Sequence, residues 1–95
     1  MALRADIEQC ETAAVSQIGY VLTAVSVAAC AYRHCDSAEE ALQWAVSLGG
    51  DTDTNAAVCG ALMGALFGAD ALPARWTEQL TCRAELRRLA ADILV

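Results

Sequence analysis

The chain has 95 residues, enough for one small domain, and 57% of them are hydrophobic. Its formal net charge is −6 and its six basic residues are all arginines, so we expect no nucleic-acid partner, because phosphate binding depends on clustered positive charge. The surplus of apolar residues instead favours packing against a protein partner, most simply a second copy of this chain in a homo-oligomer, with a dimer as the first expectation.

The spacing of apolar residues predicts an all-α fold, a compact array of about five helices. Residues 3–14 form a modestly amphipathic first helix, and residues 18–33 form a second. The uncharged stretch that contains the second helix is long enough to raise the question of a membrane span. Because polar residues interrupt it and alanine and valine dominate over leucine, we expect a helix buried in a bundle and no membrane partner.

The third predicted helix begins at a capping-box sequence. Ser37 can accept a hydrogen bond from the amide of Glu40, and the Glu40 side chain can reach back toward the chain before the helix. The helix stops at Gly49 and Gly50, since two consecutive glycines favour a sharp turn.

The fourth helix begins within residues 51–54 and runs to about residue 67. Gly60, Gly64 and Gly68 recur every four residues, which puts them on one side of that helix and predicts a close approach by another helix. A short helix opened by Pro73 follows, and residues 83–94 form the last helix. Tryptophans 44 and 76 are interpreted as anchors of the core or of an interface.

The five cysteines lack C-x-x-C spacing. Cys30 and Cys59 lie in apolar helical runs and are expected to be small core residues. The first residues become charged too soon for a secretory signal, so we expect a reduced, cytoplasmic protein. His34 lies in a break between helices and is expected at the surface, and its neighbour Cys35 does not complete a zinc site with it.

Residues 49–55, GGDTDTN, concentrate two carboxylates and two hydroxyls at the start of the fourth helix. Two interpretations are open. Acidic and hydroxyl side chains stabilise a helix N-terminus by capping amides, with Asp51 or Thr52 as the cap. The same hard oxygen atoms also suit Mg²⁺ or Mn²⁺. On spacing alone the helix cap is the simpler interpretation.

This run continues into a helix of small residues, and together they resemble the ADP-ribosylglycohydrolase family. Further similar segments are residues 19–21, 39–42, 45–48, 60–65 and 72–73, with Trp76. The resemblance implies one partial helical domain over residues 1–95, similar to the C-terminal part of the family fold. It also implies that Asp51, Asp53 and Thr54 ligate Mg²⁺ or Mn²⁺, which positions ribose hydroxyls and activates water.

The sequence also departs from the family. Members carry a second acidic cluster, of the Thr-Asp-Asp type, near the N-terminus of a much longer domain, and this sequence has none. The resemblance therefore implies half of a two-metal site and an ADP-ribose-like ligand. We expect metal-dependent hydrolysis of ADP-ribosyl glycosidic bonds only if a second chain completes the site. The alternative is a non-catalytic, self-associating helical module, or a truncated remnant with a vestigial metal motif.

Overall fold

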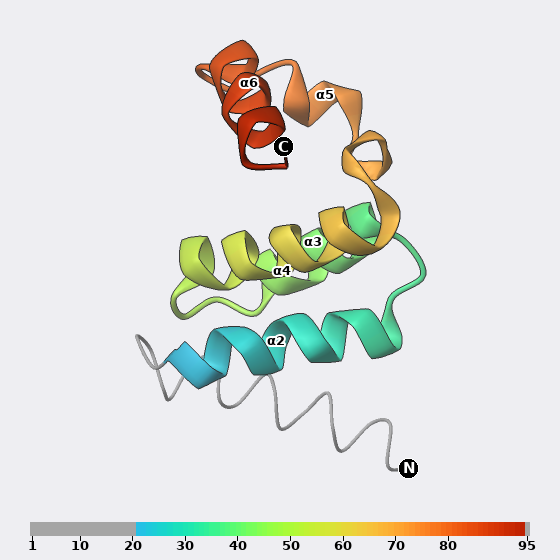
Figure 1. The fold of residues 1–95 in the computed structure, drawn as a ribbon. Coiled ribbons are helices and arrows are strands. Elements are labelled where there is room, and N and C mark those ends of the chain that lie inside the picture. The colour runs from blue at the N-terminus through green and yellow to red at the C-terminus, as the bar shows by residue number, and fades with distance from the viewer. Residues whose placement is uncertain (1–20, 95) are drawn as a thin grey trace, which may run out of the picture.

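A computed structural model describes residues 21–94 (Figure 1). Its elements in chain order are α2 (Val21–His34), α3 (Ala38–Ser47), α4 (Thr52–Phe67), the 3₁₀ helix η1 (Ala69–Ala71), α5 (Ala74–Thr77) and α6 (Arg83–Ile93). No strand occurs among these residues, so the all-α prediction is confirmed. The helix expected over residues 3–14 lies outside the described part of the chain.

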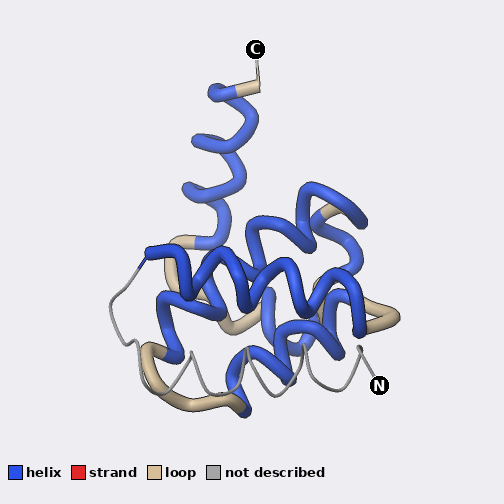
Figure 2. The backbone as a smooth tube through the Cα atoms, turned by 90° about the horizontal axis from the view of Figure 1, so that it is seen from below, coloured by secondary structure: helices blue, strands red, loops and turns tan. Residues whose placement is uncertain are grey.

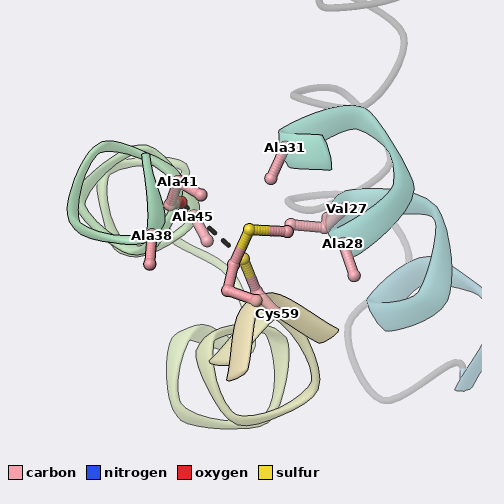
Figure 3. Close-up of a cluster of buried hydrophobic side chains, with 8 residues drawn as sticks. Val27, Ala28, Ala31, Ala38, Ala41, Ala45 and Cys59 are labelled. Atoms are coloured by element: carbon pink, nitrogen blue, oxygen red, sulfur yellow. Dashed lines mark hydrogen bonds between the residues drawn. The ribbon is translucent and has the colours of Figure 1, made fainter. Parts of the chain in front are cut away.

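Helices α2, α3 and α4 enclose a core of small side chains. Figure 3 shows the three helices surrounding the cluster, with alanines contributed by α2 and α3 and the Cys59 thiol by α4. That thiol donates a long hydrogen bond to the carbonyl oxygen of Ala41, at 3.7 Å. The largest apolar side chain that is fully buried is Met63. Because alanine projects so little, the helix backbones approach closely and modest side chains fill the space between them.

Helix α3 begins with the predicted capping box. The Glu40 amide donates to Ser37 Oγ at 3.1 Å, and Glu40 Oε2 accepts from the amide of Asp36, also at 3.1 Å. The backward reach of Glu40 therefore ends one residue before the cap. Two amide groups that the helix itself cannot satisfy gain partners, which fixes where α3 starts.

The surroundings of the α4 glycines differ from the prediction. A Cβ atom added to Gly60 would make ordinary contact, 3.5 Å, with the Leu42 side chain, and one added to Gly64 would have no described atom within 4 Å. The expected close approach along this side is therefore wrong at Gly64. Gly68 has a φ of 84° and ends the helix, a conformation that favours glycine.

Residues after Gly68 form a separate arm. None of the described residues in η1, α5 or α6 is buried, and α6 projects from the rest of the chain (Figure 2). Pro73 precedes α5 as its N-cap rather than lying in its first turn. The last predicted helix, residues 83–94, is confirmed to within one residue.

No helix among residues 21–94 combines the length and the apolar character that a bilayer crossing requires.

Candidate functional site

The acidic cluster lies where the chain turns from α3 into α4. Gly49 and Gly50 both have positive φ angles, 76° and 68°, which non-glycine residues rarely adopt. The Thr52 amide donates to the Gly50 carbonyl oxygen at 2.9 Å and closes the turn. The two glycines thus place Asp51, Asp53 and Thr54 at the first turn of α4.

Asp51 occupies the N-cap position but does not cap with its side chain. Its backbone carbonyl accepts the Asn55 amide at 2.9 Å, whereas its carboxyl group makes no capping hydrogen bond. Of the two residues predicted as the cap, Asp51 or Thr52, Asp51 occupies the N-cap position. The usual reason for an aspartate there, a side chain bonded to a free amide, does not apply.

The side chains of Asp51 and Asp53 lie close together at the first turn of α4. A hydrogen bond from the Asp51 side chain is the main cause that lowers the pKa of Asp53, and backbone amides, including that of Thr54, act in the same direction. The Thr54 amide lies 3.0 Å from Asp53 Oδ1. Adjacent negative charges repel, and a cation bound between two carboxylates would relieve this repulsion.

The cluster has an exposed side and a buried side. Asp53 and Thr54 are exposed and Asp51 is half-buried, whereas Asn55 is only 2% exposed and its Nδ2 has no described partner. The sequence prediction missed Asn55, although its spacing from Cys59 and Met63, four and eight residues, is that of a buried helix face. Asn55 therefore anchors the first turn of α4 in the core, while its neighbours face solvent.

The donor set is incomplete for a divalent cation. No group of three or more histidine, cysteine or acidic side chains able to hold a metal occurs among residues 21–94. Asp51, Asp53 and Thr54 together offer two carboxylates and one hydroxyl, all hard oxygen donors of the kind that Mg²⁺ binds. These three side chains could supply part of the coordination of one cation, and water or another chain would have to supply the remaining ligands.

Two further predicted residues differ from expectation. His34 is the last residue of α2 and not part of the break after it, and its side chain is half-buried, with both ring nitrogens covered and no described group bonded to them. Cys30 and Cys59 are buried as predicted, but Cys30 forms a disulfide, whereas Cys35, Cys59 and Cys82 are free thiols. The expected fully reduced state is therefore not met at Cys30.

A second feature joins the arm to α3. The Arg75 guanidinium forms a two-point ion pair with Glu39, with contacts of 2.6 and 3.3 Å, and lies 5.2 Å from the centre of the Trp76 ring. Arg75 holds the pKa of Glu39 below its usual value. Beside this pair is an open groove of about 430 Å³, lined by Leu42, Gln43, Val46, Ser47 and Trp76. No sequence pattern joins these residues, because α3 ends at Ser47 and α5 begins only at Ala74, with α4 and η1 between them.

The sequence profile of the ADP-ribosylglycohydrolase family matches residues 2–95. The ADP-ribosylarginine hydrolase Tri1 of Pseudomonas putida strain GB-1 is 31% identical over 75 residues, covering 79% of this chain and 20% of that protein. Human ADP-ribosylhydrolase ARH3 is 44% identical over 43 residues, covering 45% of this chain and 12% of that protein. No solved structure gives a significant match.

The chain belongs to the ADP-ribosylglycohydrolase family. It spans about a fifth of the length of the first curated relatives that it matches.

Proposed function

We propose that this chain supplies one half of a metal-dependent ADP-ribosyl hydrolase site, and that it hydrolyses ADP-ribosyl glycosidic bonds when a second chain completes that site. The closeness of Asp51 and Asp53 at the first turn of α4, in a chain that belongs to this family, supports the proposal. The names of the bacterial relatives make ADP-ribosylated arginine the first substrate to test.

In this proposal Asp51, Asp53 and Thr54 hold Mg²⁺ or Mn²⁺. The bound cation would act as a Lewis acid toward sugar hydroxyls and lower the pKa of a bound water. The protein's own contribution is to hold two carboxylates close together on an exposed helix turn. Asp51 is available for this role because its carboxyl group makes no capping hydrogen bond.

Calorimetric titration with Mg²⁺ and with Mn²⁺ tests the site directly. The variant Asp51→Asn/Asp53→Asn keeps the size of both side chains and removes both charges. Asp70→Asn is the matched control, because Asp70 is an exposed aspartate in the first turn of another helical element, η1, away from the cluster. Circular dichroism of all three proteins verifies that the helices are intact.

We expect saturable binding to the wild type and to Asp70→Asn, and none to the double variant. Binding should weaken at acidic pH, since a protonated carboxyl group no longer ligates the cation. Equal binding by the wild type and the double variant would refute the assignment. Absence of binding in the wild type at millimolar metal would favour the alternative, a family module whose acidic run has no metal.

A further inference from the structure

Helix α6 presents an apolar stripe that nothing in the described chain covers. Leu86, Leu89, Ala90 and Ile93 follow the i, i+3, i+4, i+7 spacing of one helix face. The leucines are 52% and 47% exposed and Ile93 is 82% exposed. Side chains of this kind at this spacing are the usual anchors of a helix that lies in an apolar groove.

The groove between α3 and α5 has the complementary character. Its accessible lining is almost entirely apolar, which disfavours a phosphate, a sugar or an ion as its occupant and suits aliphatic side chains. The groove is also held in shape, because the Arg75–Glu39 ion pair joins α5 to the first turn of α3. Trp76 forms one wall and Val46, 50% exposed, lies on the opposite helix.

We propose that α6 of one copy of this chain docks into the α3–α5 groove of a second copy, and that the second copy does the same in return. The resulting dimer has two-fold symmetry and two identical helix-in-groove contacts. Among residues 21–94 the α6 of the same copy does not fill the groove, because no residue of α6 lines it and α6 stands apart from α3 (Figures 1 and 2).

The distribution of charge favours a groove on this chain over a second α6 as the partner. Residues 83–95 carry three arginines and two carboxylates, whereas residues 21–82 carry two arginines and seven carboxylates. The side chains of residues 83–95 are therefore net positive, and those of residues 21–82, which bear the groove, are net negative. Opposite charges favour contact between α6 and the groove-bearing part of a second copy, whereas pairing two α6 helices would bring two segments of the same sign together.

Helical geometry places Arg83 and Arg87 along one edge of the apolar stripe and Glu85 and Asp92 along the other. This arrangement keeps the stripe itself free of charge and puts charged groups at its rim, as in protein interfaces generally. The two arginines can then approach the acidic body without entering the apolar groove.

Sedimentation velocity of the full chain at micromolar concentration tests the proposal. Every protein in this test carries Cys82→Ser, because Cys82 is an exposed thiol beside α6 that could crosslink copies, and this change leaves the Cys30 disulfide intact. Leu89→Glu disrupts the stripe and Val46→Glu disrupts the groove. Ala91→Glu is the matched control, since it adds the same charge to α6 on the opposite, exposed face. Circular dichroism verifies that each variant keeps its helices.

We expect the wild type and Ala91→Glu to be dimers, and Leu89→Glu and Val46→Glu to be monomers at the same concentration. An equimolar mixture of the two monomeric variants should form dimers again, weaker than wild type by at least tenfold in Kd. Such a mixed dimer keeps one intact contact, between the α6 of one variant and the groove of the other.

Other outcomes overturn the proposal. A wild-type monomer would show that no second copy occupies the groove. Loss of the dimer in Leu89→Glu but not in Val46→Glu would indicate that two α6 helices pair. Dimers in both variants would place the interface elsewhere, and a monomeric Ala91→Glu would attribute the effect to charge alone. The dimer requires no cation, so these results are independent of the metal titration.

Discussion

Replacing Met63 with alanine tests whether the α2–α3–α4 core holds the acidic cluster in place. Met63 is 1% exposed and lies on α4, two turns after the buried Asn55. Met63→Ala removes the side chain beyond Cβ. At about 0.8 kcal/mol for each buried methylene-sized group, the transfer cost is roughly 2.4 kcal/mol. Incomplete collapse around the cavity raises the expected loss to about 3 kcal/mol.

Urea unfolding followed by circular dichroism measures this loss. With a denaturant dependence of about 1 kcal/mol per molar for a small domain, the midpoint should fall by roughly 3 M. Leu66→Ala is the control on the same helix, because Leu66 is 46% exposed and should cost about 1 kcal/mol or less. Equal losses in the two variants, or a loss below about 1 kcal/mol for Met63→Ala, would refute the described core.

Two further predictions concern local features. Ser37→Ala should lower the free energy of unfolding, measured in urea, by about 1 kcal/mol, because it leaves the Glu40 amide without its capping partner. Ser37→Asp should restore most of this loss, since aspartate also caps helices. A Ser37→Asp protein as unstable as Ser37→Ala would argue against capping. Burial raises the pKa of the Cys35 and Cys59 thiols, so each holds less of the reactive thiolate at a given pH. Iodoacetamide at about pH 8 should therefore modify exposed Cys82 first, as mass spectrometry would show, and labelling of Cys59 at the same rate would contradict this.

Features encoded within a few residues were predictable from the sequence. The Ser37 cap needs only one amide three residues away, and the turn at Gly49 and Gly50 needs only their freedom to adopt positive φ. The ends of α4 and α6 followed from the same local signals. In each case the physical cause lies inside the segment that it shapes.

Features that depend on contacts across the chain were not predictable. The Arg75–Glu39 pair joins positions thirty-six residues apart, and neither residue type at its own position indicates the other. The glycine spacing in α4 indicated a close neighbour, but only the packing of α3 decides that Gly60 has one and Gly64 does not. Burial of the His34 ring likewise depends on how α2 meets its surroundings.

The candidate site divides in the same way. The sequence placed Asp51, Asp53 and Thr54 in one helix turn, and the structure has all three at the start of α4. The free side chain of Asp51 at the N-cap was not predictable, since an aspartate there normally caps. The identity of any further ligand lies beyond one helix turn, so metal binding stays a prediction.

The core of this protein is made by three helices that follow one another along the chain. All the residues buried among residues 21–94 come before Gly68, and the arm contributes none. During synthesis the three-helix unit can therefore complete its packing while η1, α5 and α6 are still within the ribosome, since chains emerge N-terminus first. The turn that carries Asp51 and Asp53 would be in place before the surface that we propose for pairing copies exists. Assembly with a second copy would then follow folding of each chain rather than compete with it.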